Sequence, residues 1–236
     1  SSTKGKQILD DVYEYGNFIA PEDLSSYTNK YRKEGYFTRL NYDYQNKYYA
    51  SFSLRNDGTS RFKKEKRWGS FWSIGSSWRI AQEEFMKSAH WIDDLKIRAS
   101  YGQTGVDDVL DSDGYSVYYA YQTLYGIGWN NYENPGILFS KLGNNNLLWE
   151  TQSSGGAAIE FSLWRRVRGT LEYFRKESKD LLFSLPLPVS SGTTSIDDNI
   201  GKVRNQGIEL DLNIDVIRNK DLKWSLGFNA THFTNK

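Results

Sequence analysis

The sequence of 236 residues contains no cysteine and only two histidines. Without cysteine, neither a disulfide framework nor a thiolate metal site can form. His90 and His232 lie at unrelated positions and have no partner at a metal-ligand spacing. The sequence therefore predicts no metal site, no cofactor and no Ser-His-Asp triad, and we expect a protein that is not an enzyme.

Long hydrophobic runs are also missing. No stretch of about 18 apolar residues is present, which excludes a transmembrane helix. The formal net charge of +1 gives no field that would attract nucleic acid, so no nucleic-acid partner is expected. The chain is very polar, with a mean hydropathy of -0.68, yet 16% of its residues are aromatic. This combination is typical of a membrane β-barrel, which has aromatic girdles and a polar lumen.

Apolar and polar residues alternate along much of the chain, as they do in β-strands that have one apolar and one polar face. The clearest stretches are residues 72–80, 95–101 and 208–216. The large apolar side chains on one face are expected to contact lipid: Trp72, Ile74, Trp78, Ile80, Leu210, Leu212, Trp224 and Leu226. The charged side chains on the other face are expected to line a lumen: Arg79, Arg98, Glu209, Asp211 and Asp215.

The acidic residues on the polar face indicate whether that face is buried in a dry core or is in contact with water. In a dry core, each unpartnered carboxylate would cost several kcal/mol. A water-filled lumen removes that cost. The pattern alone is also compatible with a soluble sheet that turns these residues toward solvent.

The chain is predicted to be all-β, with about eight antiparallel strands of roughly nine to eleven residues, the length that a tilted strand needs to cross a bilayer. Short turns near Asn46, Arg165 and Asn219 alternate with long polar connections at 56–70, 103–147 and 178–205. Residues 81–94 interrupt the alternation and are expected to form a short amphipathic helix on the tight-turn side. Tight turns on one side and long loops on the other are typical of outer-membrane barrels.

Five blocks of sequence, in this order and spacing, resemble one family. They are NYDYQNKYYASFSLRNDGTSRFKKEKRWGSFWSIGSSWRIAQEEFMK, LKIRASYGQTG, LLWETQ, KDLLFSLPLPVSSGT and NIGKVRNQGIELDL. Together they resemble the barrel of SusC-like TonB-dependent outer-membrane transporters, the SusC/RagA family, from about Tyr36 to Thr231. Trp72 departs from the pattern, because the family usually has proline there, and we expect a small local change at that position.

The resemblance implies a barrel of about 22 strands in the outer membrane of a Gram-negative bacterium. It also implies a plug domain that contacts TonB and a SusD-like surface lipoprotein that caps the barrel. No plug domain is recognised in this sequence, and it ends in THFTNK without the terminal aromatic residue of a finished barrel. We therefore interpret residues 1–35 as a loop or strand lead-in and residues 36–236 as an interior piece of the barrel.

The family resemblance implies import of glycan or peptide fragments. Residues with stacking or hydrogen-bonding side chains on the connection 103–147 are the candidate ligand contacts: Tyr118, Tyr119, Tyr121, Tyr125, Trp129, Asn130, Asn131 and Tyr132. Aromatic rings can stack on the C–H faces of sugars, and the amides can bond hydroxyl groups. Equally, these aromatic rings can pack the loop on itself or on the lipoprotein.

Two other segments have charged patterns. Asp107 to Gly114 departs from the calcium-loop pattern at Val109 and is expected to be a solvated acidic loop. The basic run Lys63 to Arg67 is either a solvated run or a contact to lipopolysaccharide at the outer rim of the membrane.

Two alternative functions remain open. One is a complete eight-stranded outer-membrane barrel with a structural or adhesion role. The other is a soluble carbohydrate-binding β-sandwich, in which a second sheet would cover Leu210 and Trp224.

Overall fold

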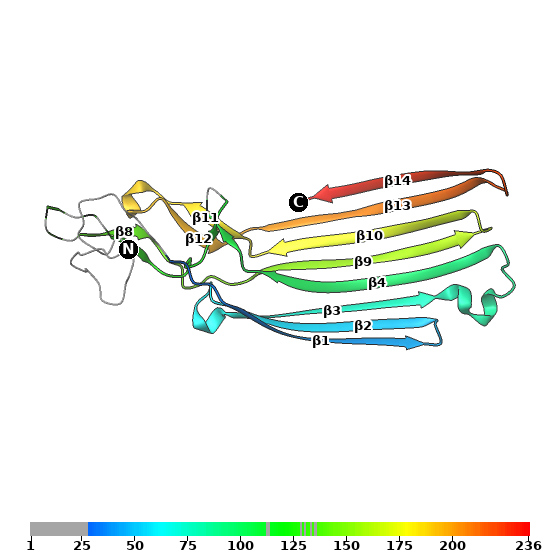
Figure 1. Ribbon diagram of the computed structural model, residues 1–236, viewed down its shortest axis with the longest axis horizontal. Helices are drawn as coiled ribbons and strands as arrows, with labels where there is room; N and C mark the ends of the chain where they lie inside the picture. Colours follow the sequence, from blue (N-terminus) through cyan, green and yellow to red (C-terminus); the bar gives the residue numbers. More distant parts are fainter. Residues whose placement is uncertain (1–27, 112–113, 128, 130, 133, 135) are drawn as a thin grey trace.

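A computed structural model describes residues 28–236, apart from positions 112–113, 128, 130, 133 and 135. Its main feature is one curved antiparallel sheet of eight long strands in the order β1-β2-β3-β4-β9-β10-β13-β14 (Figure 1). The strands are β1 (Lys33–Tyr44), β2 (Tyr48–Thr59), β3 (Trp68–Arg79), β4 (Ile92–Val106), β9 (Glu150–Leu163), β10 (Val167–Lys179), β13 (Lys202–Arg218) and β14 (Lys223–Asn235). The prediction of about eight antiparallel strands is confirmed.

The long connections contain six short strands that pair as three ribbons. They are β5 (Val109–Leu110), β6 (Ser116–Val117), β7 (Leu124–Ile127), β8 (Ile137–Lys141), β11 (Leu182–Pro186) and β12 (Ser195–Asn199). Two 3₁₀ turns, η2 (Lys64–Lys66) and η5 (Val189–Ser191), lie in the same connections. We call residues 60–67, 107–149 and 180–201 together the cap, which lies at one end of the sheet (Figure 1).

Three local predictions are wrong. The eight strands have 12 to 17 residues, longer than expected, because pairing continues past the apolar positions into polar ones such as Lys202 to Arg204. Residues 81–94 form no amphipathic helix: two 3₁₀ turns, η3 (Ile80–Gln82) and η4 (Glu84–Met86), occupy a connection too short for cooperative helix formation. Ile80 consequently lies in η3, beyond the end of β3.

Two of the tight turns at the other end have three residues between the paired strand ends, Tyr44 and Tyr48 in one and Leu163 and Val167 in the other. Gln45 and Asn46 have φ values of 55° and 53°, and Trp164 and Arg165 have φ values of 51° and 54°. Two consecutive residues with positive φ match the twist of the flanking strands. For tryptophan this conformation is unfavourable, and Trp164 stacks on Trp91 with ring centroids 5.5 Å apart.

The register places one kind of side chain on each face of the sheet. On β2, β3 and β4, Phe52 lies opposite Ile74, which lies opposite Tyr101. We define the apolar face by such in-register side chains: Leu40, Phe52, Leu54, Trp72, Ile74, Trp78, Ile97, Tyr101, Ile159, Leu171, Tyr173, Ile208, Leu210, Leu212, Ile214, Trp224, Leu226 and Phe228. The opposite side is the polar face.

A β-bulge corrects the predicted alternation at the end of β13. Asp215 pairs with Ser225, but the next paired residue is Ile217, opposite Trp224. Val216 is therefore the extra residue, and Ile217 continues the apolar face instead. Because of the bulge, Ile214 before Val216 and Ile217 after it both have their side chains on the apolar face.

The apolar face is not covered by other protein among the described residues. Ile74 is 52% exposed and Phe228 is 57% exposed. No second sheet covers Leu210 or Trp224, and the edge strands β1 and β14 do not pair with each other in the described part of the chain (Figure 1). This arrangement differs from both the closed eight-stranded barrel and the soluble sandwich.

The buried apolar core lies at the cap end of the sheet. Its members are Phe62, Phe71, Val109, Ala120, Leu147 and Trp149, with Val117 and Leu182 packed against them. These residues come from β3, from β5 and from connections that are far apart in the sequence. The long connections are thus held together by a small core of their own.

Candidate functional site

The polar face has a network of ion pairs near the middle of the sheet. The Arg98 Nε atom lies 2.7 Å from Glu160 Oε1, and the Arg98 Nη2 atom donates to Glu172. Lys96 Nζ contacts the other oxygen of Glu160 at 3.2 Å. Three neighbouring strands, β4, β9 and β10, supply these side chains. All of them are partly exposed, so each pair is worth only about 0–1 kcal/mol.

The other predicted polar-face residues also lie on this face. Arg79 binds Asp94 through two hydrogen bonds of 2.9 and 3.2 Å. Asp215 is buried and accepts a 2.8 Å hydrogen bond from the Ser225 hydroxyl. Glu209 and Asp211 are exposed. The polar face therefore exposes charged groups with both signs along its length.

Aromatic residues mark both ends of the apolar face. At the tight-turn end Trp78 stacks on Tyr48, and at the cap end Trp68 stacks on Tyr36. Ten residue steps separate Trp68 from Trp78 on β3, which corresponds to about 33 Å along the strand at a rise of about 3.3 Å per residue. With a strand tilt of about 40°, the height is about 25 Å, the height of the apolar band of a membrane β-barrel.

At the tight-turn end, Glu83 joins β2 and β3 to the η3–η4 connection. Its carboxylate accepts hydrogen bonds from the Tyr48 hydroxyl at 2.6 Å, from Trp78 Nε1 at 3.1 Å and from Lys47 Nζ at 3.1 Å. These three donors, in that order, lower the pKa of Glu83 from 4.5 to about 2. The carboxylate thus fixes two girdle aromatics and one turn lysine.

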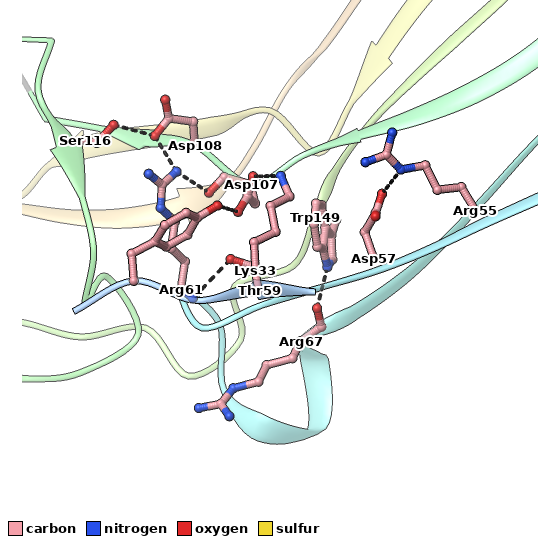
Figure 2. Close-up of polar contacts among 11 residues, drawn as sticks. Lys33, Arg55, Asp57, Thr59, Arg61, Arg67, Asp107, Asp108, Ser116 and Trp149 are labelled. Carbon is pink, nitrogen blue, oxygen red and sulfur yellow. Dashed lines mark hydrogen bonds and ion pairs between the residues drawn. The ribbon is translucent and has the colours of Figure 1, made fainter. Parts of the chain in front are cut away.

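The cap contains a second polar cluster, built around Arg61 (Figure 2). The guanidinium of this buried residue lies 4.8 Å from the Tyr31 ring centroid and 5.3 Å from that of Tyr118. It donates to the Asp107 carbonyl at 3.1 Å and to the Asp108 carboxylate. A desolvated cation between aromatic rings is worth about 2 kcal/mol for such contacts.

Asp107 lies beside this arginine, and its carboxylate joins the second cap segment to β1, to β2 and to the residue Tyr31 before β1. Its carboxylate accepts hydrogen bonds from Lys33 Nζ at 3.0 Å and from the Tyr31 hydroxyl at 3.1 Å. Burial alone would raise the pKa of Asp107, but the hydrogen bonds from Thr59, Lys33 and Tyr31 outweigh it, so the pKa is lowered. The expectation of a solvated acidic loop is wrong for Asp107, because this side chain is buried against Tyr31, Lys33 and Thr59.

The structure divides the predicted ligand residues into two groups. Tyr118 packs against Arg61 and Tyr31, the Tyr119 hydroxyl accepts a hydrogen bond from the Lys30 N–H, and Tyr121 bonds Gln122. Tyr125 is 62% exposed with one edge against Phe139, whereas Trp129 and Tyr132 are 65% and 96% exposed. Asn131 bridges to Asn134 through the backbone, and Asn130 lies outside the described residues.

Sequence reasoning missed the Arg61 cluster. Its members lie far apart in the sequence: the Tyr31–Asp107 hydrogen bond spans 76 residues, and the Tyr31 ring also contacts that of Tyr118, which is farther still along the chain. Neither periodicity nor a short motif connects such positions. The local signal is Arg61 itself, a cation directly before the apolar Phe62, but it does not indicate which distant residues Arg61 contacts.

Comparison with known proteins identifies the sheet. Residues 4–236 match the family described as TonB dependent receptor-like, beta-barrel. This chain belongs to the TonB-dependent receptor β-barrel family. The TonB-dependent receptor P39 of Formosa agariphila is 32% identical over 98% of the chain, and the TonB-dependent receptor SusC of Bacteroides thetaiotaomicron is 33% identical over 89% of it. The predicted resemblance to the SusC/RagA group is confirmed.

A solved structure agrees with this assignment. The RagAB peptide importer in its closed-closed state matches with a TM-score of 0.76 and 29% identity, covering 87% of this chain and 22% of the other. The chain spans 21% of the length of both named relatives. Members of this receptor-barrel family are outer-membrane β-barrels of Gram-negative bacteria and act as receptors and transporters.

Proposed function

We propose that this receptor-barrel chain forms part of the wall of an outer-membrane transporter that imports glycan or peptide fragments. The observation that carries the proposal is the division of one sheet into an uncovered apolar face and a charged polar face. An apolar surface of this extent is unfavourable in water and favourable against lipid. The RagAB neighbour is a peptide importer, and SusC is a TonB-dependent receptor.

In this proposal the wall acts by position and not by covalent chemistry. The apolar face contacts lipid, and the polar face lines the lumen. The edges of the sheet in the described residues, at β1 and β14, are where further strands of a larger barrel would pair. TonB would act through a plug domain inside that barrel, and a SusD-like lipoprotein would cover the cap.

The cap is the candidate mouth of the transporter. The exposed rings of Trp129 and Tyr132 follow β7, at the tip of the β7–β8 ribbon, and offer flat apolar surfaces to a ligand. Such rings stack on sugar C–H faces and on peptide side chains alike. Tyr118 and Tyr119 have a structural role instead, since both are held by residues outside the ribbon.

A spin-label experiment tests the orientation of the wall. The chain has no cysteine, so each introduced cysteine is the only one in this segment. In the complete outer-membrane protein in lipid bilayers, nitroxides at Ile74→Cys and Leu226→Cys should collide with oxygen, which dissolves in lipid. Nitroxides at the adjacent Ser73→Cys and Ser225→Cys should collide with a water-soluble nickel complex.

Other results would contradict the proposal. If labels at Ile74 and Leu226 were shielded from both reagents, the apolar face would be covered by protein, as in a sandwich.

A binding measurement tests the proposed ligand contacts of the cap. Trp129→Ala and Tyr132→Ala should each weaken the binding of oligosaccharides or peptides by about 2- to 10-fold, which corresponds to the energy of one aromatic contact. Tyr115→Ala, which removes another exposed ring of the cap, is the matched control.

A further inference from the structure

Four cations converge on one carboxylate on the apolar side of the wall, close to the cap. Glu177 Oε2 lies 2.8 Å from Arg204 Nε and 3.0 Å from Arg175 Nη2. Glu177 Oε1 lies 3.2 Å from Lys202 Nζ and 3.3 Å from Lys179 Nζ. We call these five residues the basic cluster. Glu177 is buried by its partners, whereas the four cationic side chains are 32–51% exposed.

The register shows which face carries the basic cluster. Tyr173 lies opposite Ile208 on the apolar face, and Glu177 lies opposite Arg204 four residues farther along both strands. Because side chains alternate with a period of two, Arg175, Glu177 and Lys179 share the face of Tyr173. The cluster therefore lies directly beyond the apolar band, at the end nearer the cap.

The cluster has positive charge and hydrogen-bond donors in excess. Four cations and one carboxylate leave three positive charges without a counter-charge in the cluster. A carboxylate accepts about four hydrogen bonds, whereas two guanidinium and two ammonium groups offer about sixteen N–H donors. Glu177 thus holds the cations together against their mutual repulsion and leaves most donors directed outward.

We propose that the basic cluster binds the phosphate groups of lipopolysaccharide in the outer leaflet, through Arg175, Lys179, Lys202 and Arg204. This inference rests on the proposed membrane orientation of the wall. A lipid phosphate lies just outside the hydrocarbon region, which is the level of the cluster relative to Tyr173 and Ile208. Arginine and lysine together match a phosphate, because the guanidinium gives paired hydrogen bonds and the ammonium adds a point charge. Lys236, whose backbone pairs with that of Arg204, adds a further cation at this edge.

Lipid retention by the complete transporter tests this site. The protein would be purified in detergent and mixed with bisphosphorylated lipid A, and bound lipid would be measured by native mass spectrometry. The triple variant Arg175→Gln, Lys202→Gln, Arg204→Gln should lose binding by at least about tenfold, since charge-assisted hydrogen bonds are removed. Lys176→Gln removes a lysine of the same strand that points to the opposite face and should leave binding unchanged.

Two further measurements need no variant. Lipid A without phosphates should bind the wild-type protein at least about tenfold more weakly, and inorganic phosphate at millimolar concentration should not displace bound lipid A. Equal binding of dephosphorylated lipid A, displacement by inorganic phosphate, or equal losses in the triple variant and Lys176→Gln would each overturn the inference. If the spin labels confirm the wall while lipid binding is unaffected by the triple variant, only this inference fails.

Discussion

An arginine placed at the centre of the apolar face should destabilise the barrel, and one placed at its edge should not. On β13 the apolar face runs from Ile208 to Ile217, so Leu212 lies near its middle. Four residue steps of about 3.3 Å and a tilt of about 40° place Leu212 about 10 Å from the level of Ile208. Leu212 lies between Gly169 and Phe228 and has no polar partner on that face.

The expected losses follow from depth. Leu212→Arg should lower the free energy of unfolding by about 2–4 kcal/mol, which changes the folding equilibrium about 30- to 1,000-fold. Ile208→Arg should cost about 0–1 kcal/mol, because its guanidinium can reach the level of Arg204 and of water. Asn213→Arg, on the neighbouring polar-face position, is the matched control and should change stability by less than about 1 kcal/mol.

Denaturant titration of the complete protein in phospholipid bilayers, followed by tryptophan fluorescence, measures these differences. The expected result is a large cost for Leu212→Arg and small costs for both Ile208→Arg and Asn213→Arg. Equal costs at Leu212 and Ile208 would refute a depth-dependent lipid contact. If Leu212→Arg lowered the free energy of unfolding as little as Asn213→Arg does, both faces of the sheet would be in contact with the same medium.

Three further variants test the turns and the cap. Arg61→Met should loosen the cap by about 2–4 kcal/mol, because it removes the cation from between the Tyr31 and Tyr118 rings, takes the Arg61 donor from the Asp107 carbonyl and leaves Asp108 with Ser116. Hydrogen exchange of residues 107–149 should rise while the strands stay protected, and Lys63→Met is the control. Glu83 has a lowered pKa of about 2, so its contribution to stability is present above pH 4.5 and is lost as the pH falls toward 2; Glu83→Gln should remove this pH dependence from the tight-turn end. Asn46→Gly should stabilise the β1–β2 hairpin by up to about 1 kcal/mol in denaturant titrations, because glycine adopts the observed positive φ without strain.

The sheet was predictable because its determinants are local. Alternation of side chains fixes both faces of a strand, so Trp72 and Ile74 could be separated from Ser73 without knowledge of any neighbour. The same rule failed where the chain left the sheet. Ile80 continues the alternation of β3 in the sequence, yet β3 ends at Arg79 and Ile80 begins a 3₁₀ turn.

The cap was not predictable because its determinants are distant in the sequence. The sequence around Asp107 offers no nearby cation, so it predicts a solvated acid. The partners of Asp107 in the structure, Tyr31, Lys33 and Thr59, all lie far from it in the sequence. The basic cluster is an intermediate case. Alternation along β10 places Lys179 beside Glu177, but only the β10–β13 register brings Lys202 to the same carboxylate.

Hydrogen bonds join the three connections of the cap to one another. Arg61 binds the second segment through Asp108, and Asn144 of the second segment donates to the Asp197 carbonyl at 3.0 Å in the third. Asn199 and Leu148 exchange two hydrogen bonds of 2.8 and 2.9 Å between the same segments. A ligand that displaces the second segment would therefore have to break contacts to both of the others.

The wall and the cap differ in what stabilises them. The apolar side chains of the wall, such as Ile74 and Phe228, are largely uncovered, so in the proposed orientation their favourable transfer from water depends on lipid. The cap buries Phe62, Val109 and Leu147 completely and has its own core. It follows that extraction from the membrane should disturb the wall first, and that the cap can present Trp129 and Tyr132 from a frame whose packing does not require lipid. In the proposed transporter, this separation would keep the ligand contacts ordered at the membrane surface.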